Sequence, residues 1–269
     1  MFSFLKYIKD KSPKLNFLWF ALGSIYRFFI IKLNINFYIN QKISKYGPFK
    51  MHCYFAFSNF KNWGSEEGSI FPLMMKTCKK KKCIIDIGAH IGLTTLPLSS
   101  IISKNSIIFS FEPSNVNNKY LLLHLKKNNI KNVKVIDRLV GKKNSSNVSF
   151  YELSKPTGMN SIVKTKKKSF IQKKTQVSLD NFIKKNKLKP DLIKIDAEGS
   201  EIFILKGAIN ILKNYKPDIF LSVHKNHLKK LHLNLKELLT IIKEIGYKVQ
   251  DSKGNFSENF NSKEYHLFF

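Results

Sequence analysis

The chain has 269 residues, of which 43% are hydrophobic. A chain of this length and composition can bury the core of one α/β domain with an extension, so a chain that is disordered over its whole length is excluded. The formal net charge of +29 is compatible with a nucleic acid, an anionic lipid or an acidic substrate as partner. Only Arg27 and Arg138 are arginines, however, and readers of base sequence rely on arginine, so we expect a solvated lysine-rich surface and no specific nucleic-acid partner.

Residues 1–45 form a predicted helical extension with an apolar segment. Leu15–Ile31 carries many large apolar side chains, and lysines flank it at both ends. The segment is 17 residues long and includes polar residues, whereas a membrane span needs about 20 apolar residues. Three interpretations remain open: a helix packed on the core or on a second subunit, an interfacial membrane helix with snorkelling lysines, and a true span.

The cysteines of the chain are Cys53, Cys78 and Cys83, an odd number with no CxxC pair. A reducing compartment is the simplest interpretation, so we expect a cytoplasmic protein. An interfacial helix at residues 15–31 would place it at the inner face of the membrane by peripheral association.

Residues 46–82 are predicted to lead into the main domain. Glycine and proline interrupt a stretch of alternating aromatic residues, which indicates short strands followed by a helix. The aromatic side chains of residues 54–63 would serve for base stacking if the protein bound RNA.

Residues 83–269 are predicted to form the main domain, because strand-like and helix-like periodicities alternate along them. The strand-like runs are Cys83–Ile87, Ser106–Phe111, Val133–Val140, Asp191–Ile195 and Asp218–Val223. The segments with helical spacing are Gly92–Ile102, Asn115–Asn128, Glu201–Leu212 and Leu235–Ile245. Continuously apolar strands are typical of a parallel sheet covered on both faces, so we expect a doubly wound, Rossmann-like α/β fold.

Two further predictions concern strands outside this parallel core. Residues 147–153 and 175–177 are expected to form an extra hairpin or insert before the fourth core strand. Tyr265–Phe269 is expected to add a final antiparallel strand to the sheet.

The sharpest motif is IIDIGAHIGLTT, in which Asp86 ends a buried strand and Gly88 and Gly92 flank the turn into a helix. Glycine lets the backbone approach a ligand closely, and free amide groups at a helix start attract a negative group such as a carboxylate. The GxxxG spacing lacks the third glycine of the dinucleotide pattern GxGxxG, so a bound pyrophosphate is less favoured.

The next strand-like run ends at Glu112, in the segment FSFEPS. An acidic residue at the tip of the second strand is positioned to accept hydrogen bonds from the two ribose hydroxyls of a nucleoside. Together with Asp86, Gly88 and Gly92, it predicts a nucleoside-binding site.

A second cluster, DLIKIDAEGSEIFILKGA, lies at the fourth core strand. Asp196 ends the strand, Glu198 lies in the turn, and Glu201 begins the next helix. Ligands bind outside the carboxyl ends of the strands in open α/β sheets, so this turn should face the same crevice as Gly88. For Glu201, capping of the helix is an equal alternative. The fifth strand-like run leads to His224, which is expected to emerge beside Asp196.

The motifs DIGAHIGLTT, FEPS, VSLDNF, DLIKIDAEGSEIFILKGA and VHKNH, in this order, resemble the FkbM family of S-adenosylmethionine-dependent methyltransferases over about residues 60–250. The resemblance implies a class I methyltransferase fold and, usually, O-methylation of a hydroxyl on a sugar, glycan or secondary metabolite. The expected cofactor-binding residues are Asp86, Gly88, Ala89, His90, Gly92 and Glu112. The expected catalytic residues, near the transferred methyl group, are Asp196, Glu198 and His224.

Two positions depart from the family pattern. His90 stands where the family often has asparagine, and Ser222 stands where it often has glutamate. The second departure concerns the acceptor side of the site.

The expected mechanism is displacement at the sulfonium methyl carbon, with the acceptor oxygen aligned behind it. His224 is the first candidate for the base, since histidine titrates nearest to neutral pH, and Asp196 would orient it or act directly. No metal is assigned to the site, although a divalent ion held by Asp196, Glu198 and His224 is an alternative way to lower the pKa of the acceptor hydroxyl.

Two other functions are kept as alternatives. An NAD-dependent oxidoreductase would also have an acidic residue at the tip of the second strand, but the pattern GxGxxG is missing. An RNA-binding methyltransferase-like protein would use the lysine surface and the aromatic side chains of residues 54–63.

Overall fold

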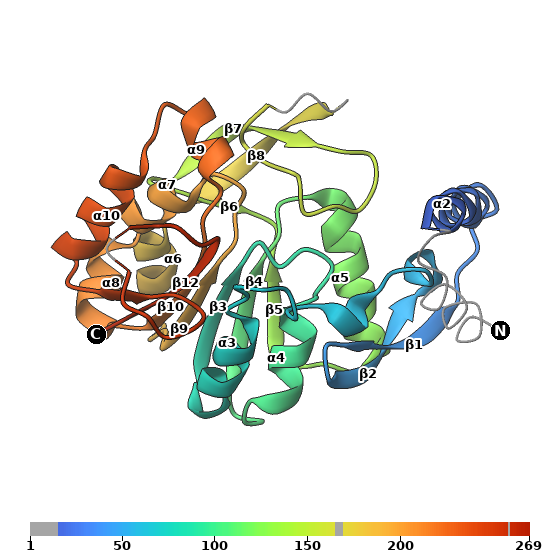
Figure 1. The fold of residues 1–269 in the computed structure, drawn as a ribbon, viewed down its shortest axis with the longest axis horizontal. Helices are drawn as coiled ribbons and strands as arrows, with labels where there is room; N and C mark the ends of the chain where they lie inside the picture. Colours follow the sequence, from blue (N-terminus) through green and yellow to red (C-terminus); the bar gives the residue numbers. More distant parts are fainter. Residues whose placement is uncertain (1–15, 165–168, 258) are drawn as a thin grey trace.

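The structure is a computed structural model that describes residues 16–164, 169–257 and 259–269. Its centre is a seven-stranded sheet in the order β11-β12-β10-β9-β3-β4-β5 (Figure 1). The strands are β3 (Cys83–Ile87), β4 (Ile107–Phe111), β5 (Val133–Ile136), β9 (Leu192–Ile195), β10 (Asp218–Ser222), β11 (Lys248–Gln250) and β12 (Glu264–Phe268). The five strands from β10 to β5 are parallel, and β12 runs antiparallel to both of its neighbours. The predicted parallel core and the final antiparallel strand are therefore confirmed.

Helices cover both faces of this sheet, because successive strand residues point to opposite sides. Ile84 and Ile108 pack with one layer of helices, whereas Ile85 and Phe109 pack with the other. The first layer contains α3 (Phe71–Thr77), α4 (Thr95–Ile101) and α5 (Asn115–Lys127). The second layer contains α6 (Leu179–Lys185), α7 (Glu201–Lys206), α8 (Ile209–Tyr215) and α10 (Leu235–Glu244). The short helix α9 (Lys225–Lys230) follows β10.

A separate three-stranded sheet carries the predicted insert. Strand β7 (Ser145–Glu152) pairs antiparallel with β8 (Phe170–Val177), which confirms the hairpin. The run that was expected to be one strand over residues 133–140 is divided, because β6 (Leu139–Val140) leaves the main sheet after β5 and pairs with β8.

The helix expected over residues 201–212 is also divided, into α7 and α8, at Gly207. A Cβ atom at Gly207 would overlap the carbonyl oxygen of Gly141, so the chain passes too close for a side chain there. The carbonyl of Gly207 accepts a hydrogen bond of 2.9 Å from the amide of Asp180 in α6. These tertiary contacts interrupt a sequence whose apolar spacing is otherwise helical.

The extension and the lead-in segment differ from the predicted boundary at residue 45. Helix α2 (Asn16–Lys32) confirms the predicted helix over the described residues, whereas β1 (Tyr38–Ile43) and β2 (Tyr46–His52) form one hairpin across that boundary. Three short 3-10 helices follow, namely η2 (Cys53–Phe55), η3 (Phe60–Asn62) and η4 (Cys78–Lys80). No helix in the described part of the chain is both long enough and apolar enough to cross a membrane.

Two of the aromatic residues that were expected to be available for base stacking belong instead to the core. Tyr54 and Phe55 are 7% and 5% exposed, and both rings pack against Tyr120 of α5. Buried rings cannot stack on bases, so these two residues give no support to an RNA-binding function.

Candidate functional site

A cavity of about 730 Å³ opens at the carboxyl ends of β3, β4, β9 and β10. Residues that follow each of these strands line it, among them Gly88, Glu112, Asp196 and His224. The motifs that contain Gly88 and Asp196 therefore face one common cavity, as expected for the edge at which parallel strands end.

The turn after β3 requires glycine at position 88. Gly88 has a φ of +78°, and a Cβ atom there would overlap the carbonyl oxygen of Asp196. The turn after β3 and the turn after β9 thus approach each other more closely than a side chain would allow.

Glu112 lies on the wall of the cavity and is 4% exposed. Its carboxylate accepts hydrogen bonds from the amides of His90 at 2.7 Å and Ser114 at 2.9 Å. Burial raises the pKa of Glu112 to about 7, although these hydrogen bonds oppose the rise. A carboxylate that is fixed in this way presents its remaining lone pairs in a set direction.

The amide groups of the turn are used within the chain, contrary to the expectation that they are free for a ligand. The amides of Gly88 and Ala89 both donate to the carbonyl of Phe111, and the amide of His90 donates to Glu112. Nε2 of His90 is buried, and no group in the described part of the chain hydrogen-bonds to it. Burial lowers the pKa of His90 to about 4, so the ring is neutral and lines the cavity.

Asp86 and Gly92 were expected to contact the cofactor, but neither lines the cavity. The Asp86 side chain is fully buried and accepts a hydrogen bond of 2.6 Å from Thr95. A Cβ atom at Gly92 would lie 3.1 Å from a methyl carbon of Leu121. Asp86 and Gly92 therefore support the conformation of the turn without lining the cavity.

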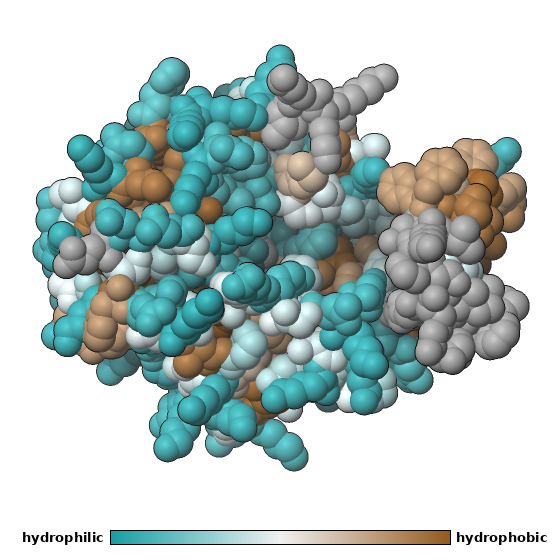
Figure 2. All heavy atoms as spheres, viewed as in Figure 1, coloured by the Kyte–Doolittle hydropathy of each residue, from teal (hydrophilic) through white to brown (hydrophobic). Residues whose placement is uncertain are grey.

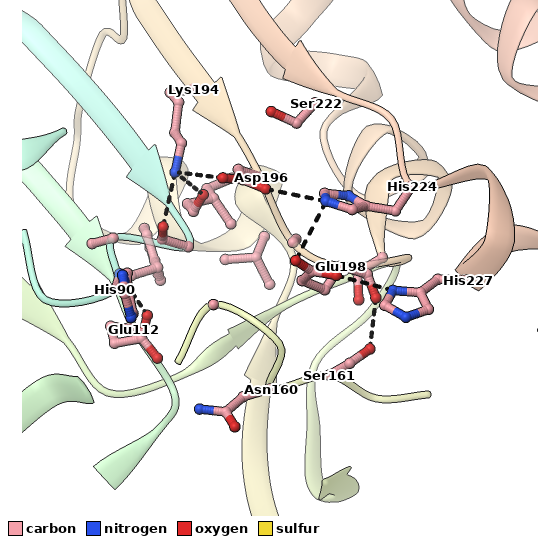
Figure 3. A pocket seen from close by; sticks show the side chains of 18 of the residues that line it. His90, Glu112, Asn160, Ser161, Lys194, Asp196, Glu198, Ser222, His224 and His227 are labelled. Atoms are coloured by element: carbon pink, nitrogen blue, oxygen red, sulfur yellow. Dashed lines mark hydrogen bonds and ion pairs between the residues drawn. The ribbon is translucent and has the colours of Figure 1, made fainter. Parts of the chain in front are cut away.

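Lys194, which the sequence analysis did not select, connects the two turns. Its Nζ donates to the carbonyl of Gly88 at 2.8 Å and lies 3.3 Å from Asp86. It also lies 3.7 Å from Asp196 (Figure 3). Burial would lower the pKa of Lys194, but the carboxylates of Asp86 and Asp196 outweigh it and raise the pKa. The feature of the sequence that could have pointed to Lys194 is its place as a lysine inside the otherwise apolar strand LIKI.

Asp196, Glu198 and His224 meet at one side of the cavity, as predicted (Figure 3). Nε2 of His224 lies 3.6 Å from Oδ1 of Asp196 and 3.4 Å from Oε1 of Glu198. Glu198 has a φ of +48°, and its carbonyl accepts a hydrogen bond of 2.6 Å from Ser161 in the insert. The insert therefore holds the turn that carries Glu198.

Glu201 is part of this cluster and also contacts the turn that precedes its helix. Its side chain is fully buried, and its Oε1 lies 2.6 Å from Nδ1 of His224. The side chain also accepts a hydrogen bond from the amide of Gly199 in the preceding turn. Glu201 thus both caps the turn and orients the imidazole.

The charges of the cluster act on the imidazole of His224. Burial alone would lower its pKa, but the hydrogen bond and charge of Glu201, together with Asp196 and Glu198, raise the pKa to about 9. With no other cation on Nε2, the imidazole carries a proton at neutral pH. A protonated imidazole cannot accept the proton of a hydroxyl group, which argues against His224 as the base.

The insert supplies polar groups to the opposite wall of the cavity. Thr157, Asn160 and Ser161 all line it, as does Ser222 at the end of β10. The amide of Leu153 donates to Asn160 at 2.9 Å, so that side chain has a partner within the insert. The insert therefore reaches the cavity.

The strand order is that of the Rossmann-like class I methyltransferase fold, and methyltransferases of this class depend on S-adenosylmethionine. The residues of the cavity fit this cofactor, since two residues with buried polar groups line it: Glu112 with its carboxylate, and His90, whose Nε2 has no hydrogen-bond partner in the described chain. Residues 86–249 match the Methyltransferase FkbM domain, and the chain belongs to this family.

Solved structures with similar folds include an FkbM methyltransferase from Methylobacillus flagellatus KT, with 20% sequence identity and a TM-score of 0.47. The match covers 71% of this chain and 44% of that chain, so this chain matches less than half of that protein's length. A precorrin-6y C5,15-methyltransferase from Geobacter metallireducens GS-15 has 13% identity and a TM-score of 0.43, over 74% of this chain and 88% of that one. No curated protein matches the chain.

Replacing Lys194 by methionine is predicted to lower the free energy of unfolding by about 3–5 kcal/mol, because Asp86 would keep a buried charge without a partner. Urea unfolding followed by circular dichroism measures this change. Lys104→Met, in an exposed loop, is the control and should change stability by less than about 0.5 kcal/mol. An equal effect of the two substitutions would contradict the role of Lys194.

Proposed function

We propose that this methyltransferase transfers the methyl group to a hydroxyl oxygen of a sugar, a glycan or a secondary metabolite. The observation that carries the proposal is the cluster of Asp196, Glu198 and His224 on the cavity wall. A hydroxyl group must lose its proton as its oxygen gains the methyl group, and this cluster offers carboxylate oxygens that can accept it.

The cofactor is proposed to lie along the turns after β3 and β4. S-adenosylmethionine, when bound, supplies a methyl group made electrophilic by the sulfonium. Glu112 would accept hydrogen bonds from the ribose hydroxyls, and Gly88, Ala89 and His90 would line the methionine end. Asp86 and Gly92 would act indirectly, by keeping that turn in shape.

The acceptor is proposed to lie between the catalytic cluster and the insert. The side chains of Asp196 and Glu198 are 35% and 21% exposed, so their oxygens remain accessible from the cavity. The hydroxyl proton would pass to one of these carboxylates, while His224 holds them in position through Nε2. Thr157 and Asn160 would contact the polar groups of a sugar-like acceptor.

His224→Ala is predicted to reduce methyl transfer by about 100-fold or more, since the carboxylates would lose the group that positions them. Transfer from S-adenosylmethionine to methyl glycosides and simple alcohols is measured by mass spectrometry, with product linkage assigned by NMR. Lys229→Ala, an exposed change on helix α9, is the control. Full turnover by His224→Ala, or methylation of nitrogen instead of oxygen, would contradict the proposal.

Helix α2 is further proposed to attach the enzyme to an anionic membrane surface. One side of the helix packs on the protein, where Ile30 is buried and the Tyr26 hydroxyl donates to the carbonyl of Cys53. Elsewhere large apolar side chains are exposed, including Phe17 at 78% and Phe20 at 72% (Figure 2). The described helix has no acidic residue and the chain has a net charge of +29, which favours anionic lipid over a second copy of the chain.

The full chain is predicted to sediment with vesicles that contain phosphatidylglycerol and to bind less to neutral vesicles. The triple variant Phe17→Ser, Phe20→Ser, Phe28→Ser should lose this binding, because the inserted apolar side chains are removed. Phe256→Ser removes a phenylalanine that is equally exposed, at 72%, but lies far along the chain from α2, and it should bind normally. Unchanged binding of the triple variant, or dimerisation without vesicle binding, would overturn this proposal.

A further inference from the structure

Asp196 and Glu198 each use one carboxylate oxygen to contact a neighbouring basic residue. Their other carboxylate oxygens face one common point. Oδ2 of Asp196 lies 3.7 Å from Lys194, and Oε2 of Glu198 lies 3.1 Å from Nδ1 of His227. The other two oxygens, Oδ1 and Oε1, both face Nε2 of His224 (Figure 3). One donor atom from each of these three residues lies within 4.8 Å of the other two.

The third donor, Nε2 of His224, is directed by a buried carboxylate. Glu201 lies 2.6 Å from Nδ1 and is fully buried, so Nδ1 is the nitrogen that carries the hydrogen of this contact. Nε2 is thereby turned toward Asp196 and Glu198. A histidine that ligates a metal ion commonly donates its other N–H to a carboxylate in this way. Oε2 of Glu201 is buried without a hydrogen-bond partner in the described chain.

The distances fit a bound cation better than direct hydrogen bonds. Charge-assisted N–H···O contacts are usually about 2.7–2.9 Å long, whereas Nε2 lies 3.4 and 3.6 Å from the two carboxylate oxygens. A cation with bonds of about 2.0–2.2 Å separates neighbouring ligands by about 3.0–3.6 Å at tetrahedral or octahedral angles. The separations of Nε2 from the two carboxylate oxygens, 3.4 and 3.6 Å, lie in this range.

We propose that Asp196, Glu198 and His224 bind a divalent transition-metal ion such as Mn²⁺, with its remaining coordination positions open to the cavity. Two carboxylate oxygens and one imidazole nitrogen suit this class of ion. The role of the ion rests on the proposed hydroxyl methylation: an acceptor oxygen on the open side would become more acidic. The proton would pass to a carboxylate oxygen of the cluster that does not bind the ion.

The test is a titration of the full chain with MnCl₂, without cofactor or acceptor, followed by the electron paramagnetic resonance signal of free Mn²⁺. Saturable binding of one ion per chain is expected, and Glu198→Gln and His224→Ala should each weaken it by at least about 10-fold. Glu67→Gln removes an exposed carboxylate elsewhere and should leave binding unchanged. Binding of S-adenosylhomocysteine by each variant shows that it is folded.

Absence of saturable Mn²⁺ binding, or equal binding by the wild type, Glu198→Gln and His224→Ala, would overturn the metal site. Because this readout needs no turnover, it is separate from the proposed reaction. Mn²⁺ binding by a protein that methylates no hydroxyl would leave the metal site standing and overturn the proposed function alone.

Discussion

The buried charge of Lys194 is the interaction on which the arrangement of the site depends. Its ammonium group lies between Asp86 on β3 and Asp196 at the end of β9, and it also binds the carbonyl of Gly88. Asp86 is fully buried, and a buried carboxylate resists ionisation without a cation beside it. Lys194 therefore allows Asp86 and Asp196 to be charged while the turns after β3 and β9 remain in contact.

The close contact of these two turns brings the proposed cofactor side and the proposed acceptor side next to each other. Gly88 permits the approach because it has no Cβ atom, and Asp196 provides the carbonyl that it approaches. Methyl transfer demands that donor and acceptor atoms be held in line at short distance, so such a junction suits the reaction. The insert completes the site from the other side through Ser161 and the backbone of Glu198.

Much of this site could be predicted from the sequence, because the carboxyl ends of parallel strands meet at one edge of a sheet. That rule brings Glu112 and Asp196 to one cavity although they are far apart in the chain. Periodicity and motifs do not report tertiary partners, however. The contact of Lys194 with Gly88 spans 106 residues, and the break of the predicted helix at Gly207 depends on Gly141. Whether Asp86 contacts the cavity or lies beneath it likewise depends on packing.

The central claim, that the turn after β3 and Glu112 form the cofactor site, is tested most directly by calorimetric titration with S-adenosylhomocysteine. The account predicts binding in the micromolar range by the wild type, and loss of binding in both Gly88→Arg and Glu112→Ala. Failure of the wild type to bind S-adenosylhomocysteine, or tighter binding of NAD in a parallel titration, would contradict the account.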